Sequence, residues 1–200
     1  PQISNFSLNM DLSITNDAKV EISLPAQLGL IQARGSGDLN MNLSRTGNFR
    51  MSGDYTIDNG LFFFKIRNLL NRKFVLNEGG TISWTGNPYN GTLGMSAKYQ
   101  LKTSLSSLGL EQDSSFKSRV PVDCIIGLTG PIMNPNVKFR FDFPNATEEV
   151  KQFVFTKIDT TNASEMSQQM LSLLIFNSFS FNSGTGGNTS LANSVSGTSM

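Results

Sequence analysis

Residues 53–99 carry the sequence GDYTIDNGLFFFKIRNLLNRKFVLNEGGTISWTGNPYNGTLGMSAKY, and this stretch decides the fold class. Strand-like runs within it are separated by clusters of Gly, Asn and Pro at residues 58–60, 77–80 and 86–88. Such clusters are typical of turns, because Gly and Asn tolerate a positive φ. The stretch therefore predicts a β-meander, with a hairpin formed by residues 74–76 and 81–84.

Strict alternation of apolar and polar residues extends the β pattern towards the N-terminus. It is clearest in residues 6–14, where Phe, Leu, Met, Leu and Ile alternate with Ser, Asn, Asp and Ser. A period of two predicts strands with one apolar and one polar face. Similar strands are expected at residues 18–24, 27–34, 38–44 and 49–57, with turns at residues 16–17, 35–37 and 45–48.

Residues 61–66 break this alternation, because Leu, Phe and Ile side chains fall on both faces of the predicted strand. Such a strand is either buried on both sides or marks an exposed contact surface. Phe62 and Phe64 are the candidate partner contacts under the second interpretation. Trp84 is predicted to be a core residue, and residues 92–103 are predicted to form a long strand.

The C-terminal part of the chain changes character after residue 144. Asn145 to Glu148 have the form of a helix N-cap with an acidic residue in the first turn. A second helix is expected from Ala163, because Met166, Met170, Leu173 and Leu174 follow helical spacing. We therefore divide the chain into a β domain (1–144), a helical segment (145–177) and a flexible Gly/Ser/Asn-rich tail (178–200).

The amino-acid composition limits the classes of function that we expect. Charged residues make up 16% of the chain and its net charge is +1, which argues against a nucleic-acid partner. The chain has no His, and its single Cys124 lies in an alternating strand where a buried, inert thiol is expected. Without imidazole or a thiolate cage, we expect neither an enzyme nor a metal or cofactor site.

Two segments carry a family resemblance. The first comprises GTISWTGNPYNGTLGMSAKY at residues 80–99, with FFFKIRN and KFVLN before it, and the second is LTGPIMNPNVKFRFDFP at residues 128–144. In this order they resemble the C-terminal domain of the TamB family of bacterial envelope proteins, especially its Bacteroidota branch. With the alternating strands, the resemblance covers most of residues 35–177.

The resemblance implies a curved, taco-shaped antiparallel sheet with an apolar interior and one or two short C-terminal helices. It implies the C-terminal part of a bridge across the periplasm, anchored in the inner membrane by an N-terminal helix outside this sequence. Such a protein would shield phospholipid between the two membranes and pair with an Omp85-class outer-membrane barrel. The alternative is an interaction module for outer-membrane protein assembly, which binds strands without conducting lipid.

The residues support the lipid hypothesis independently, because strands that share one apolar face can form a groove for acyl chains. A closed β-sandwich with a dry core would show the same alternation, so sequence does not separate the two. The predicted groove residues are Phe6, Leu8, Met10, Leu12, Ile14, Val20, Ile22, Leu39, Met41, Leu43, Phe49, Met51, Leu93, Met95 and Tyr99.

Overall fold

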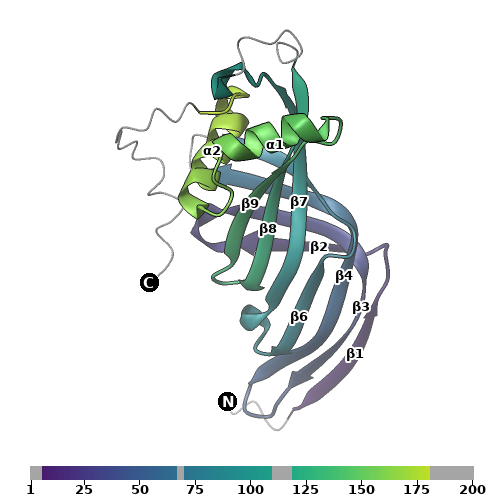
Figure 1. The fold of residues 1–200 in the computed structure, drawn as a ribbon. Helices are drawn as coiled ribbons and strands as arrows, with labels where there is room; N and C mark the ends of the chain where they lie inside the picture. The colour runs from purple at the N-terminus through teal and green to yellow at the C-terminus, as the bar shows by residue number, and fades with distance from the viewer. Residues whose placement is uncertain (1–5, 67–69, 110–118, 181–200) are drawn as a thin grey trace. The chain divides into compact units, whose positions relative to one another are not determined.

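The computed structural model describes residues 6–66, 70–109 and 119–180, which form mainly β structure with two helices (Figure 1). One antiparallel sheet of nine strands has the order β1-β3-β4-β5-β7-β8-β9, with β2 pairing with β3, and β6 with β4 and β7. This confirms the predicted fold class. The strands are β1 (Leu8–Ile14), β2 (Lys19–Leu24), β3 (Gly29–Leu43), β4 (Phe49–Ile66), β5 (Leu70–Leu76), β6 (Thr81–Gly86), β7 (Thr92–Thr103), β8 (Val120–Pro131) and β9 (Asn136–Asp142), and the helices are α1 (Glu148–Lys157) and α2 (Ala163–Phe176).

The turns expected at residues 35–37 and 58–60 are wrong, because both segments lie inside long strands. β3 and β4 run unbroken for 15 and 18 residues and pair with each other along their length. A Cβ atom at Gly35 would overlap the carbonyl oxygen of Thr56, and one at Gly37 would overlap that of Asp54. These glycines therefore allow two backbones to approach closely instead of reversing the chain.

β1 and β2 precede these two long strands, and β5 and β6 follow them. Each of these pairs is collinear and does not form a hairpin. β1 pairs with residues 37–43 of β3, and β2 pairs with residues 29–34 of the same strand, so the chain keeps its direction through residues 15–18. In the same way, β5 and β6 pair with successive parts of β4. The expected hairpin of residues 74–76 and 81–84 is wrong for this reason, and so is a reversal at residues 16–17.

The irregular positions of these strands line up across the sheet, and we term this line the crease. It passes through residues 15–18, Asp58 and residues 77–80. Asp58 has no partner in β3, because Arg34 faces Asn59 while Gly35 faces Ile57. Ile57 connects β4 to residues 77–80, since its N–H donates to the Gly80 carbonyl (2.7 Å) and its carbonyl accepts from the Gly79 N–H (2.8 Å).

Asp58 forms a β-bulge. As the additional residue in β4, it changes which side chains of that strand lie on the same face. Odd-numbered residues before the bulge and even-numbered residues after it both face the same side as the odd-numbered residues of β3. The crease thus separates two parts of one continuous face. We term them the β2–β5 half (β2, β5 and residues 29–34 and 59–66) and the β1–β6 half (β1, β6 and residues 37–43 and 49–56).

The β2–β5 half contains a packed aromatic core. Ile31, Phe62, Phe64 and Phe74 have no exposed surface. The ring centroids of Phe62 and Phe64 lie 5.8 Å apart, and the Phe74 ring stands edge-on to Phe64 at 5.9 Å. Residues 61–66 therefore belong to a buried central strand. Phe62 and Phe64 do not form the surface that a direct partner contact requires.

Contacts divide the chain into two units, Pro1–Ala97 with Gly127–Val137, and Lys98–Ile126 with Lys138–Met200. In the second unit α1 begins after Thr147, whose Oγ1 accepts from the Val150 N–H at 3.5 Å. The N-cap thus lies two residues later than the predicted Asn145. α2 begins at Ala163 as predicted, because Asn162 Oδ1 accepts from the N–H groups of Ser164 and Glu165.

The predicted apolar face of α2 is confirmed. Met166, Met170, Leu173 and Leu174 are all buried. The helix ends at Asn177 in a left-handed conformation. The chain then runs back along the helix, where Ser178 accepts a hydrogen bond from Ser172 and Ser180 exchanges two with Gln169. Of the predicted tail from residue 178, the part after Ser180 lies outside the described residues.

Candidate functional site

One face of the β1–β6 half carries apolar side chains in rows that cross β1, β3 and β4. Side chains directly opposite on neighbouring antiparallel strands are about 5 Å apart at Cβ, so each row is a contiguous apolar strip. Figure 1 shows β1, β3, β4 and β6 side by side in this part of the sheet. The rows are Leu8–Leu43–Phe49, Met10–Met41–Met51–Gly86, Leu12–Leu39–Gly53–Trp84 and Ile14–Gly37–Tyr55–Ile82–Leu93.

The rows that begin at Leu8 and Met10 carry exposed side chains. Leu8 and Met10 are each 42% exposed, and Phe49 is 44% exposed, whereas Ile31 and Phe62 in the β2–β5 half are fully buried. Large apolar side chains that share one exposed face indicate a contact or ligand surface. We term this surface the open face, comprising Leu8, Met10, Leu12, Ile14, Met41, Leu43, Phe49 and Met51.

The rows become buried as they reach β6. Trp84 is 8% exposed, and its indole Nε1 donates to the Pro88 carbonyl at 3.0 Å. A Cβ atom at Gly91 would touch both Trp84 and Ile132, so these residues pack closely together. Trp84 is therefore a core residue, as predicted, and it bounds the open face on this side.

The opposite face of the same strands is polar and internally hydrogen-bonded. Asn40 Nδ2 donates to Asp11 Oδ1 at 2.7 Å and to Asn9 Oδ1 at 3.2 Å. Ser13 Oγ donates to Asp38 Oδ1 at 2.6 Å. Strands β1 and β3 are thus amphipathic, with a water-compatible face behind the open face.

A cavity of about 270 Å³ lies beside the Met10–Met41–Met51–Gly86 row. The side chain nearest to Gly86 is that of Arg50, because a Cβ atom at Gly86 would lie 3.5 Å from Arg50 Nη2. Sequence analysis did not single out Arg50, since only the register reveals that Gly86 leaves space beside it. The cavity is lined by Asn40, Asn42, Arg50, Met51, Ser52, Thr85 and Gly86.

The structure gathers the predicted groove residues only in part. Those of β1, β3 and the start of β4 share the rows of the open face, although Leu39 is only 6% exposed. Val20 and Ile22 are half-buried in the β2–β5 half, and Phe6 is an exposed residue just before β1. Leu93 and Met95 are buried in the core, and Tyr99 is half-buried in the second unit.

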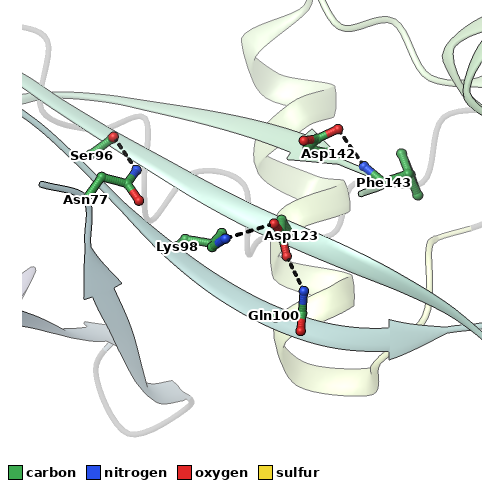
Figure 2. Close-up of polar contacts among 7 residues, drawn as sticks. All are labelled: Asn77, Ser96, Lys98, Gln100, Asp123, Asp142 and Phe143. Carbon is green, nitrogen blue, oxygen red and sulfur yellow. Dashed lines mark hydrogen bonds and ion pairs between the residues drawn. The ribbon is translucent and has the colours of Figure 1, made fainter. Parts of the chain in front are cut away.

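Polar contacts in the second unit include a buried carboxylate (Figure 2). Asp123 is 5% exposed. Its carboxylate forms an ion pair with Lys98 Nζ at 3.2 Å and accepts a hydrogen bond from Gln100 Nε2 at 2.8 Å, so its negative charge is compensated. The neighbouring Cys124 has no exposed surface. Burial, reinforced by the negative charge of Asp123, raises the pKa of this thiol from 9.0 to about 12. The predicted buried thiol is confirmed.

Within residues 6–66, 70–109 and 119–180, no three acidic, Cys or His side chains are grouped as metal ligands would be. Neither helix of this part has the length and apolar character needed to cross a bilayer.

Comparison with known proteins identifies a family. A family model described as the TamB C-terminal domain matches residues 2–200. A comparison with curated proteins finds no match. The family match covers essentially the whole chain, including both units and both halves of the sheet. This chain therefore belongs to the TamB C-terminal domain family.

Proposed function

We propose that the open face shields phospholipid acyl chains, and that the domain is the C-terminal part of a bridge carrying phospholipid between the inner and outer membranes. Family membership supports the broader statement that the chain has a TamB-related role in the translocation and assembly module. It also suggests a periplasmic, envelope-associated protein that works with an Omp85-class partner. We propose in addition an inner-membrane anchor outside this sequence and docking to an outer-membrane barrel of that class.

The observation that carries this proposal is the uncovered apolar surface on one side of β1, β3 and β4. From Leu8 to Ile14 the open face extends about 20 Å along β1, using about 3.3 Å per residue. Burying a methylene group contributes about 0.8 kcal/mol, so an acyl chain along these rows gains several kcal/mol without a specific hydrogen bond. The polar face behind the rows keeps the domain compatible with an aqueous compartment.

A charge placed on the open face tests this proposal. Met41 lies in the middle of its row and is half-buried, so Met41→Arg introduces a cation where a chain would lie. Ser36→Arg is the matched control, because Ser36 is an exposed residue on the polar face of the same strand. Met95→Arg is unsuitable, since Met95 is 5% exposed and a buried cation would disrupt folding.

The measurement is native mass spectrometry of the domain purified from cells, followed by lipid extraction. We expect phospholipid with the wild type and with Ser36→Arg, and at least a tenfold smaller lipid load with Met41→Arg. Circular dichroism establishes that both variants are folded. A lipid-free wild type, or an unchanged load in folded Met41→Arg, would contradict lipid shielding by the open face.

A second candidate function is strand binding during outer-membrane protein assembly. It is favoured by the edge of the sheet, where β1 and β2 pair only with β3 among the described strands. An exposed strand edge offers backbone donors and acceptors to an added strand. If Met41→Arg still captures an outer-membrane strand peptide, that result supports this function. If Met41→Arg loses both peptide capture and lipid binding, the result argues against a separate site at the edge.

A further inference from the structure

We infer that the cavity beside Arg50 binds the phosphate group of an amphiphile whose acyl chain lies on the open face. This inference deepens the proposed function and rests on it, because it assigns a position to the lipid headgroup. Most residues that line the cavity belong to the polar face, and Met51 and Gly86, which belong to a row of the open face, complete the lining. Arg50 belongs to the polar face and Met51 to the open face, and the two meet beside Gly86.

Because Gly86 has no side chain, the Arg50 guanidinium can lie beside the apolar row that contains Met51. Gly86 is the last residue of β6 and faces Met51 across the strand pair. The Arg50 guanidinium lies over this glycine. A chain that follows Met10, Met41 and Met51 across the strands thus leads directly to a cationic group at the margin of the sheet.

The lining of the cavity suits an oxyanion. A guanidinium presents five donors in a planar fork that matches phosphate geometry. Arg50 forms no ion pair with the carboxylates of the described parts of the chain, and no carboxylate lines the cavity. Two acidic side chains of the polar face already accept hydrogen bonds, Asp11 from Asn40 Nδ2 and Asp38 from Ser13 Oγ. Asn42, Ser52 and Thr85 supply further neutral hydrogen-bonding groups to the cavity.

Soluble ligands separate the headgroup from the chain. The 200-residue chain is titrated by calorimetry with dihexanoyl phosphatidic acid, with dihexanoylglycerol, which lacks the phosphate, and with inorganic phosphate, which lacks the chain. The test variant is Arg50→Gln. The matched control is Arg45→Gln, which removes the same charge from the exposed turn between β3 and β4 without touching the cavity. Met41→Arg reports on the open face.

We expect Arg50→Gln to weaken binding of dihexanoyl phosphatidic acid about tenfold, as for loss of a charged hydrogen bond that is partly exposed to water. Binding of dihexanoylglycerol should change less than twofold. Arg45→Gln should match the wild type with both ligands, and Met41→Arg should weaken both. Inorganic phosphate should bind much more weakly than phosphatidic acid, because it gains nothing from the open face.

Each contrary outcome has a distinct meaning. If Met41→Arg weakens both lipids but Arg50→Gln behaves like Arg45→Gln, the proposed function stands and the headgroup site is overturned. Inorganic phosphate binding as tightly as phosphatidic acid identifies a free-anion site and overturns the link to lipid. If the wild type binds neither lipid, or Met41→Arg binds both normally, the proposed function fails and this inference fails with it.

Discussion

The β2–β5 half and the β1–β6 half are built from the same two long strands, yet one is a closed core and the other is not. In the β2–β5 half, β3 and β4 meet through Ile31 and Phe62, which are fully buried. In the β1–β6 half the same strands meet through Met41 and Met51, which remain partly exposed. Alternation is therefore common to both halves and does not decide which of them is filled.

The size of the side chains accounts for the difference. Phe62, Phe64 and Phe74 fill the β2–β5 half with three interacting rings. The exposed rows of the β1–β6 half carry Leu and Met side chains and a single ring, that of Phe49, whereas glycine occurs on this face in both halves, at positions 29 and 60 as well as 37, 53 and 86. A sheet face that is apolar but thinly filled is free to accept an apolar ligand, whereas a face filled with aromatic rings is not.

Truncating one residue in each half should give the largest contrast. Phe62→Ala should lower the free energy of unfolding by about 3–5 kcal/mol, because it leaves a cavity in a packed core. Met41→Ala should cost less than about 1 kcal/mol, since its side chain already borders solvent. Urea unfolding of both variants measures the difference. Equal costs would mean that the open face is as tightly packed as the core.

A fully buried thiol outside both halves provides a reference for the comparison, and its burial can be tested through pH. The pKa of Cys124 is about 12 in the folded chain against 9.0 ordinarily, so the folded state disfavours the thiolate. Its contribution to stability is fully present below pH 9 and is lost as pH rises towards 12, by about 1.4 kcal/mol for each pH unit. Urea unfolding at pH 8 to 10.5 should show this loss in the wild type and not in Cys124→Ala.

The same thiol chemistry can be moved to the open face. Met41→Cys in a Cys124→Ala background should react readily with a maleimide at pH 8, while Cys124 in the wild type should be protected until the protein unfolds. A slow reaction at position 41 would contradict an uncovered face. In cells such protection would instead indicate a bound ligand, and extracting the lipid should then restore the reactivity.

The smallest effect is expected at the border between the open rows and the buried ones. Tyr55 is 1% exposed, and its hydroxyl has no hydrogen-bond partner among the described residues. Burial, followed by the charge of Asp58, raises the pKa of this hydroxyl. Tyr55→Phe should therefore raise the free energy of unfolding by about 1 kcal/mol in thermal or urea unfolding. A lower stability would show that the hydroxyl does make a hydrogen bond.

Much of the fold follows from local patterns in the sequence. Alternation predicted the strands and their apolar faces, and helical spacing predicted α2 with its buried side. The register was not predictable, because Gly and Asn clusters serve equally in turns, bulges and close backbone approaches. The clusters at residues 35–37 and 58–60 were assigned to turns for this reason, although the chain does not reverse at either.

The candidate site was predictable to the same extent. The side chains of β1, β3 and early β4 were assigned to the correct face by alternation alone. Leu93 and Met95 carry the same pattern but are buried, and alternation alone does not distinguish a buried apolar face from an exposed one. Arg50 was missed since its role depends on Gly86, which lies opposite Met51 only once β4 and β6 are paired.

The bulge at Asp58 also decides where this sequence can change in length. Deleting that single residue would restore simple alternation along β4 and leave Phe62 and Phe64 on the core face, because Asp58 is the residue that has no partner in β3. A one-residue deletion in a regularly paired part of β4, such as residues 49–56, would instead turn the side chains on one side of the deletion to the opposite face. In relatives of this chain, length differences of one residue should therefore occur at the bulge, whereas substitutions on the open face remain free to vary in size.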